Sequence, residues 1–294
     1  MLTLRLTRFP FLVATLPTIF LASSLVLFEH GALSWVRLII TTVGLVSAQL
    51  ASNTANDYWD EEADSANQGF TRFSGGSRVL PEGLLTRGYV RKVYVGLYVL
   101  AFACGLFLAY TNPWILPLIG LGFFFSYFYT APPLRLGYRY VGEVVVGLNF
   151  GWLMSVGVYM VQYATPSLTL HLLSLIPSIT VALILLINEF PDYEYDKACK
   201  KKNLIVLLGR ERGAVLYSAT ILSVHLLLTS YVLIGVVGPQ ALLGLFTLPL
   251  AAFAAFMTGV KRCYDDPVTL ERVQAITIVI SVATSVLVGL GLLL

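Results

Sequence analysis

The chain has 294 residues, of which 57% are hydrophobic and only 12% are charged, and its mean hydropathy is +0.80. A soluble domain carries about 25% charged residues, so this composition excludes an ordinary soluble globular protein. The formal net charge of +3 is small, and no nucleic-acid partner is expected. The three cysteines and three histidines are scattered along the chain, which argues against a zinc site or a disulfide framework.

Long apolar runs separated by short polar segments predict an all-α membrane protein with nine transmembrane helices. The predicted spans are residues 10–28, 34–56, 89–111, 113–130, 141–163, 170–190, 213–236, 239–260 and 273–294. Most of them approach the ~20 residues that a helix needs to cross the hydrocarbon core of a bilayer. The third and fourth spans are separated at Asn112-Pro113, because Asn-Pro is a turn signal. No small-residue cleavage site follows the first apolar run, which predicts a retained first helix instead of a signal peptide.

The charges are segregated on one side of the predicted membrane. With alternating sides, 18 of 19 basic residues and 15 of 16 acidic residues lie on the side of the N-terminus, and only Arg37 and Glu29 lie opposite. The positive-inside rule makes this side cytoplasmic, together with its two long loops, 57–88 and 191–212. Acidic residues contribute little to topology, so their segregation indicates a site that uses them. In a prokaryote, this pattern predicts a multi-pass protein of the inner (cell) membrane.

One acidic motif, Asn-x₃-Asp-x₃-Asp, occurs twice on this side. The first copy runs from Asn56 to Asp64 and closes the second span, and the second copy runs from Asn188 to Asp196 and closes the sixth. The motif is expected by chance roughly 0.004 times in this composition, so two copies at equivalent positions are a strong signal. A solvated acidic helix end is the alternative for either copy taken alone.

The repeat also predicts the architecture. Its copies are 132 residues (188 − 56), or four spans, apart. We therefore expect a single domain over residues 1–294, with two four-helix pseudo-repeats at about 10–130 and 141–260 around a central cavity. The ninth helix, at about 273–294, is the extra one.

Residues four apart lie on one face of a helix, so each copy predicts a ladder of oxygen ligands. The predicted metal ligands are Asn56, Asp60, Asp64, Asn188, Asp192 and Asp196. Oxygen ligands without His or Cys select Mg²⁺ or Ca²⁺, and Mg²⁺ is commonly held by one or two carboxylates plus substrate phosphate oxygens. Two facing ladders predict two Mg²⁺ ions around a diphosphate. Pro191 should kink or restart the helix of the second copy.

Basic residues follow both copies, as expected if they offset the charge of a diphosphate leaving group. The candidates are Arg72, Arg78, Lys201 and Lys202, with Arg135 and Arg139 between the fourth and fifth spans. Gly75 and Gly76 permit the close backbone approach that phosphates favour. The alternative is that many of these cations only follow the positive-inside rule.

The two motifs on nine helices resemble those of the UbiA superfamily of intramembrane prenyltransferases, over about residues 5–290. The resemblance implies Mg²⁺-dependent transfer of a polyprenyl group from its diphosphate to an aromatic acceptor. The family pattern Asp-x₂-Asn-x₄-Arg is met by Asp64, Asn67 and Arg72, and it implies diphosphate binding by the last two. After the second motif the chain departs from the family, with Lys200 in place of Gly and Asn203 in place of Thr.

The stretch from Tyr129 to Glu143 is similar to that of the 1,4-dihydroxy-2-naphthoate polyprenyltransferases of menaquinone synthesis. This likeness implies that dihydroxynaphthoate is the acceptor and loses its carboxylate as CO₂. Tyr129 is expected to face the allylic cation, and Arg139 and Glu143 are the candidate acceptor residues. Glu143 is alternatively an ordinary acid at a helix N-terminus. Other acceptors stay open: 4-hydroxybenzoate, homogentisate, chlorophyllide or a glycerol phosphate ether lipid.

A small-molecule transporter is the rival class, because repeats and membrane helices suit it as well. Transporter sites lie near mid-membrane, whereas the middles of these spans hold almost no ionisable residues. The expected partners are therefore the polyprenyl diphosphate, the acceptor and the lipid bilayer, with no obligate protein partner. The sequence does not indicate the prenyl chain length or the oligomeric state.

Overall fold

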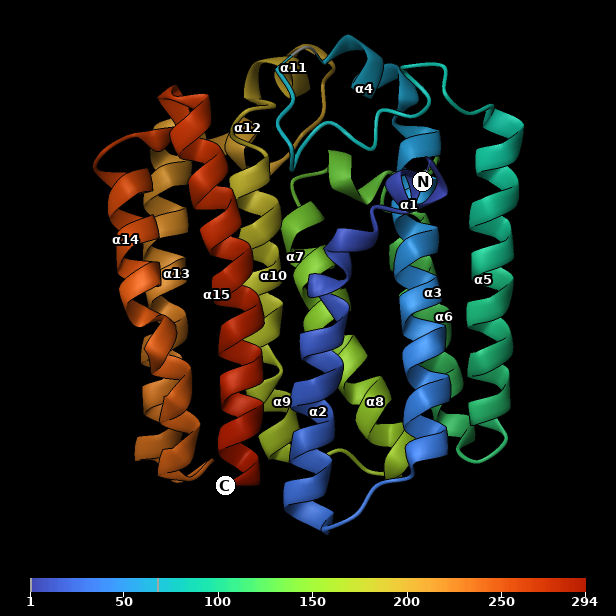
Figure 1. The fold of residues 1–294 in the computed structure, drawn as a ribbon, viewed down its shortest axis with the longest axis vertical. Helices are drawn as coiled ribbons and strands as arrows, with labels where there is room; N and C mark the ends of the chain where they lie inside the picture. Colours follow the sequence, from blue (N-terminus) through green and yellow to red (C-terminus); the bar gives the residue numbers. More distant parts are fainter. Residues whose placement is uncertain (1, 68) are drawn as a thin grey trace.

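The computed structural model describes residues 2–67 and 69–294. Every regular element in these residues is helical, which confirms the all-α prediction, and the long helices run side by side in one bundle (Figure 1). The long elements are α2 (Thr15–His30), α3 (Trp35–Trp59), α5 (Arg87–Ala109), α6 (Leu116–Tyr127), α10 (Leu175–Asn188), α13 (Arg210–Leu233), α14 (Leu248–Gly259) and α15 (Pro267–Leu293). The fifth span comprises α7 (Gly142–Gly147), the π-helical turn η4 (Leu148–Leu153) and α8 (Met154–Gln162).

Shorter elements cap or connect these helices. They are α1 (Leu2–Leu6), η1 (Phe9–Val13), α4 (Glu61–Ala66), η2 (Pro113–Ile115), η3 (Leu136–Tyr138), α9 (Leu168–Leu173), α11 (Tyr193–Ala198), α12 (Leu204–Leu208), η5 (Pro239–Thr247) and η6 (Cys263–Asp265). The turn predicted at Asn112-Pro113 is present, because α5 ends at Ala109 and the chain becomes helical again at Pro113.

Within the described residues, eight helical segments are long and apolar enough to cross a membrane. The fourth predicted span, Pro113–Tyr127, is also apolar but shorter. At 1.5 Å per residue it reaches only about three quarters of the ~30 Å hydrocarbon core, so the count of nine spans stays a prediction. The last helix begins at Pro267, six residues before the predicted start at 273, because Asp266 caps it by accepting a hydrogen bond from the Thr269 N–H at 3.1 Å.

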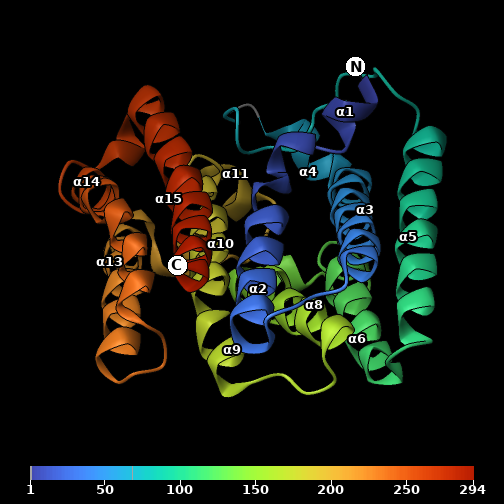
Figure 2. The ribbon, with the colours of Figure 1, turned by 60° about the horizontal axis from the view of Figure 1, so that its bottom comes forward.

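The polar elements gather at one end of the bundle. α1, α4, α11 and α12 lie at the top of Figure 1, whereas the α2–α3 and α8–α9 connections lie at the bottom. Figure 2 shows α3 and α5 on one side of the bundle and α13 and α14 on the other, with α2, α10 and α15 between them. Because α4 also contacts α11, the two loops that carry the acidic motifs meet at the same end.

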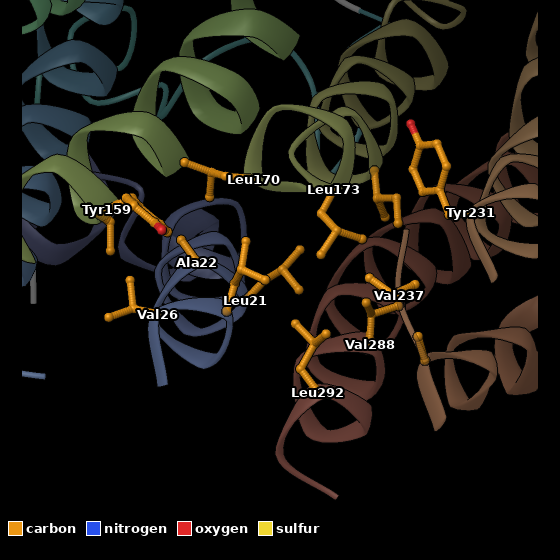
Figure 3. Close-up of a cluster of buried hydrophobic side chains, with 14 of the residues drawn as sticks. Leu21, Ala22, Val26, Tyr159, Leu170, Leu173, Tyr231, Val237, Val288 and Leu292 are labelled. Carbon is orange, nitrogen blue, oxygen red and sulfur yellow. The ribbon is translucent and has the colours of Figure 1, made fainter. Parts of the chain in front are cut away.

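A buried apolar cluster closes the opposite end of the bundle (Figure 3). It brings together side chains of α2, α8, α9, α13 and α15, among them Leu21, Val26, Leu170, Leu173 and Val288. The outward faces of the helices are apolar as well, as shown by Leu226, Leu233 and Phe246, which are more than two thirds exposed. An apolar outer surface on a bundle of long apolar helices is that of a multi-pass membrane protein.

Candidate active site

The first acidic motif keeps its helical register across a bend at Asp60. Helix α3 ends at Trp59 and α4 begins at Glu61, yet the Asp60 N–H still donates to the Asn56 carbonyl at 2.8 Å. The Asp64 N–H in turn donates to the Asp60 carbonyl at 2.8 Å. The i to i+4 spacing therefore survives, and Asn56, Asp60 and Asp64 all line one cavity.

The second motif is divided between two helices, so the prediction of one continuous ladder is wrong for this copy. Helix α10 ends at Asn188, and α11 begins at Tyr193, directly after Asp192. The break coincides with Pro191, which has no N–H to donate, and this confirms the predicted restart of the helix. Asp192 and Asp196 still share one turn, because the Asp196 N–H donates to the Asp192 carbonyl at 2.7 Å.

Side chains of the first loop hold the second motif in place. Asn67 Nδ2 donates to Asp192 Oδ1 at 2.8 Å, and Ser74 Oγ donates to the same oxygen at 3.0 Å. Asn203 Nδ2 donates to Asp196 Oδ2 at 2.7 Å, so the residue that departs from the family pattern orients a motif carboxylate. The predicted diphosphate contact of Asn67 stays a prediction, since its amide nitrogen is engaged by Asp192.

Both motifs line a cavity of about 210 Å³ at the polar end of the bundle. Among its lining residues are eight of the predicted site residues outside the cations: Asn56, Asp60, Asp64, Asn67, Tyr129, Asn188, Asp192 and Asp196. Four carboxylates and three amide side chains from opposite halves of the chain thus face one space. This arrangement is suited to hold cations and the phosphate oxygens that accompany them.

Two cations from separate parts of the chain also line this cavity. Lys201 Nζ lies 3.7 Å from Asp196 Oδ1, and Arg8 Nη2 donates to Asp57 Oδ1 at 2.7 Å. Burial works to lower the pKa of Lys201, but the Asp196 and Asp60 carboxylates outweigh it and raise that pKa well above its ordinary value. Arg8 was not among the predicted site residues. Its partner Asp57 belongs to the first motif, but only the structure shows that Asp57 is buried and pairs with Arg8.

The other predicted cations do not line the cavity. Arg72, Lys202, Arg135 and Arg139 have exposed side chains. Arg139 donates to the Leu134 and Pro133 carbonyls of its own loop. Sequence distance from the motifs therefore did not predict which basic side chains face the site.

Arg78 lies behind the first motif. Its guanidinium donates to the Asp64 carbonyl and, at 3.3 Å, to the Asn67 carbonyl. It also stacks on Phe70, with 4.4 Å between the guanidinium carbon and the ring centroid. Arg78 thus fixes the backbone of the loop that carries two of the lining side chains.

The Gly75-Gly76 turn lies against the first motif. Both residues have positive φ, +71° and +77°, a conformation that glycine adopts without strain. A Cβ on Gly76 would lie 2.1 Å from Asp64 Oδ2 and 3.2 Å from Arg8 Nη2. Glycine is therefore required here for the backbone to approach the Asp64 carboxylate.

The motif carboxyl groups are hard to ionise in the protein alone. Burial raises the pKa of Asp64 to about 7 and that of Asp196 to about 6. Burial also raises the pKa of Asp60 and Asp192, although Lys201 opposes the shift of both. Buried carboxylates that share a space without enough positive charge are good ligands for a cation, because its binding removes the cost of their ionisation.

The donor set fits Mg²⁺ in the presence of a substrate diphosphate. Its atoms are hard carboxylate and amide oxygens, and Asn188 Oδ1 is buried without a hydrogen-bond partner in the described chain. No three Asp, Glu, His or Cys side chains of residues 2–67 and 69–294 converge as a complete metal cage. Mg²⁺ commonly binds through one or two carboxylates when phosphate oxygens and water supply its other ligands.

Tyr129 and Glu189 also line the cavity, and Glu143 lies near Glu189. Burial, with a smaller contribution from Glu189, raises the pKa of Tyr129 well above its ordinary value, so this phenol stays neutral. Burial and the adjacent Glu143 carboxyl raise the pKa of Glu189 in the same direction. Glu189 lines the cavity, whereas Glu143, the predicted acceptor residue, lies behind it. Glu189 was not among the predicted site residues, although it directly follows the motif residue Asn188.

A second cavity of about 160 Å³ adjoins the first and is mostly apolar. It lies among α3, α5, α6 and the η4–α8 segment, and Gly44, Phe102, Leu108, Phe123 and Gly157 are in its wall. The two cavities have five lining residues in common: Gln49, Ser52, Ser126, Asn149 and Phe150. A polar chamber that leads into an apolar one is suited to a ligand with a charged head and a hydrocarbon tail.

The fold and this site are those of a helical membrane protein in which two acidic motifs line one polar cavity. The chain matches the UbiA prenyltransferase family over residues 15–270, and it belongs to this family.

Among curated relatives, it is 30% identical to a 2-carboxy-1,4-naphthoquinone phytyltransferase of Synechocystis sp., over 60% of this chain and 57% of the relative. It is 26% identical to a 1,4-dihydroxy-2-naphthoate octaprenyltransferase of Bacillus subtilis, over 68% of this chain and 64% of the relative. The chain thus covers less than two thirds of each of these proteins. A digeranylgeranylglyceryl phosphate synthase of Thermococcus kodakarensis also matches, at 30% identity over 55% of this chain and 53% of the relative.

Solved structures show the same fold. A UbiA homolog from Aeropyrum pernix K1 superposes with a TM-score of 0.72 at 17% identity, covering 94% of this chain and 95% of that one. A UbiA homolog from Archaeoglobus fulgidus, bound to DMAPP and Mg²⁺, gives a TM-score of 0.64 at 18% identity, covering 96% and 98%.

Proposed function

We propose that the protein transfers a polyprenyl group from its diphosphate to an aromatic acceptor, with 1,4-dihydroxy-2-naphthoate as the acceptor. The observation that carries this proposal is the convergence of two acidic motifs on a polar cavity that adjoins an apolar one. The diphosphate head is assigned to the polar cavity and the prenyl tail to the apolar one. Dihydroxynaphthoate is favoured because the first two curated relatives are named for naphthoquinone or naphthoate acceptors.

The residues assigned to two Mg²⁺ ions are Asn56, Asp60, Asp64, Asn188, Asp192 and Asp196. When bound, the ions supply positive charge that polarises the diphosphate. Other side chains of the protein orient three of these carboxylates by hydrogen bonds. Asn67 and Ser74 donate to Asp192, and Asn203 donates to Asp196. Tyr138 donates to Asp60 Oδ1 at 2.8 Å.

Lys201 and Arg8 are the fixed cations that neutralise the departing diphosphate, because both line the cavity. The allylic C–O bond breaks and the diphosphate leaves with the electron pair. A ring carbon of the acceptor then bonds to the allylic carbon, and the acceptor carboxylate leaves as CO₂ and returns its electron pair to the ring. Tyr129 presents a neutral aromatic side chain to the transient allylic cation, and the apolar cavity excludes water from it.

The test is a transfer assay with protein purified in detergent. It contains Mg²⁺, a labelled polyprenyl diphosphate and a panel of acceptors: dihydroxynaphthoate, 4-hydroxybenzoate, homogentisate, chlorophyllide and glycerol phosphates. We expect a labelled lipid product with dihydroxynaphthoate that disappears when EDTA is added. A product with another acceptor alone would reassign the acceptor, and no labelled product with any acceptor would refute the proposed enzyme.

A further inference from the structure

Two buried glutamates lie close together, Glu189 in the wall of the polar cavity and Glu143 behind it, and prenyl ionisation uses neither of them. Glu189 follows the last residue of α10 and is 6% exposed, while Glu143 lies in the first turn of α7 and is 2% exposed. Charged side chains are rarely buried to this degree without a partner. Their position next to a ligand cavity therefore requires an explanation.

The hydrogen bonds of this pair are incomplete. Glu143 Oε1 accepts from the Leu204 N–H at 2.7 Å, which anchors Glu143 to the start of α12. Glu143 Oε2 and Glu189 Oε2 are both buried and accept no hydrogen bond from an N–H or hydroxyl group in the described part of the chain, and the two carboxyl groups lie close enough to share one proton. A buried acceptor without a hydrogen-bond donor destabilises the folded protein. Such a group is tolerated where a ligand completes its hydrogen bonds.

The surroundings of Glu189 indicate which kind of ligand does so. Val181 and Leu185 lie four residues apart on one face of α10 and line the cavity, and Glu189 lines it just beyond the end of that helix. Val145 and Val146 of the fifth span line it as well. The carboxyl group thus stands at the polar end of an apolar wall, which suits a flat aromatic ring that carries a hydroxyl group.

Glu189 is not one of the motif positions assigned to the metal, and its carboxyl group interacts with that of Glu143. The nearby cation Lys201 is engaged by Asp196 instead. A neutral hydrogen-bond donor is therefore the better partner for its free oxygen.

We propose that Glu189 binds the aromatic acceptor by accepting a hydrogen bond from a ring hydroxyl, with Glu143 as the positioning residue behind it. This inference rests on the proposed function, since it names the acceptor side of the same site. It places the acceptor ring against the α10 wall, beside the motif residues that face the diphosphate. It also makes the free hydroxyl, and not only the ring, a requirement for binding.

The experiment compares the binding of dihydroxynaphthoate and of its dimethyl ether by calorimetry, in protein without donor. The wild-type protein should prefer the free hydroxyl by roughly 10- to 100-fold, the range expected for a hydrogen bond to a buried polar group. Glu189→Met, which keeps the length of the side chain but cannot accept this bond, should reduce the preference to within about twofold. Glu189→Gln should retain part of it, and Glu143→Gln should weaken it.

Glu194→Gln is the matched control, because Glu194 is an exposed acid near Glu189 in sequence, and it should leave the preference unchanged. In parallel transfer assays, the KM for the polyprenyl diphosphate should stay within about twofold of wild type in Glu189→Met. The inference is overturned if Glu189→Met keeps the wild-type hydroxyl preference, or if the wild-type protein has none. A wild-type protein that binds the acceptor with this preference but transfers no prenyl group would refute the proposed function and leave the acceptor site standing.

Discussion

Replacing Gly76 by alanine tests whether the position of the Asp64 carboxylate sets the rate of transfer. The new Cβ would lie 2.1 Å from Asp64 Oδ2, and ordinary contact begins at 3.4 Å, so the carboxylate must move by about 1.3 Å (3.4 − 2.1). A misplacement of about 1 Å in a catalytic constellation costs on the order of 100-fold in rate. The left-handed backbone, with φ of +77°, adds a separate cost of about 1–2 kcal/mol to the free energy of unfolding.

Gly83→Ala separates these two effects. Gly83 has a φ of +67° in the same loop, but a Cβ there meets nothing within 4 Å. Both variants should lose similar thermal stability in detergent, whereas only Gly76→Ala should lose about 100-fold in the initial rate of Mg²⁺-dependent transfer. Equal rates in the two variants would refute the reasoning that the turn positions Asp64.

Mg²⁺ affinity should rise with pH between about 5 and 8 and then level off, because protons compete for Asp196, with a pKa of about 6, and Asp64, with a pKa of about 7. Calorimetry in buffers of different ionisation enthalpy should show that Mg²⁺ binding releases protons. A Mg²⁺ affinity that does not depend on pH would contradict the competition between protons and Mg²⁺ for these carboxylates. Arg8→Met should lower the free energy of unfolding by about 1–3 kcal/mol, because it leaves a buried acid without its partner. Arg5→Met removes the partly exposed Arg5–Glu82 ion pair and should lower the free energy of unfolding by at most about 1 kcal/mol. Equal losses of stability in the two variants, measured by thermal melts, would contradict the burial of the Arg8–Asp57 pair. Gly157→Leu should fill part of the apolar cavity. It should lower kcat/KM for long polyprenyl diphosphates on the order of 10-fold relative to kcat/KM for geranyl diphosphate. An unchanged chain-length preference would contradict the assignment of the prenyl tail to this cavity.

Much of the fold could be predicted because membrane helices are encoded locally. Apolar runs and turn residues such as Asn112-Pro113 indicate where helices begin and end. The repeated motif likewise predicted which carboxylates face one cavity, since its spacing and charge segregation are visible in the chain. Pro191 marked the break in the second copy, but it did not show that all of the residues from Glu189 to Asp192 lie between the two helices.

The parts that could not be predicted depend on contacts between distant segments. Arg8 enters the cavity because the N-terminal segment folds back onto Asp57, which lies 49 residues away in sequence. Arg72 follows the first motif closely but points to solvent. The role assigned to Glu189 depends on burial and on Glu143 beside it, and neither is visible in a motif.

The central claim is that both acidic motifs bind the Mg²⁺–diphosphate group and that both are needed for transfer. Asp60→Asn and Asp192→Asn each replace one motif carboxylate with a group of the same shape, and Glu62→Gln and Glu194→Gln change exposed acids beside them. The direct measurement is the rate of Mg²⁺-dependent prenyl transfer by these four variants. We predict that each Asp variant loses at least about 1,000-fold while each Glu variant stays within about threefold of wild type, as expected for loss of charge stabilisation at the reacting group. A wild-type rate in either Asp variant would contradict the two-motif site.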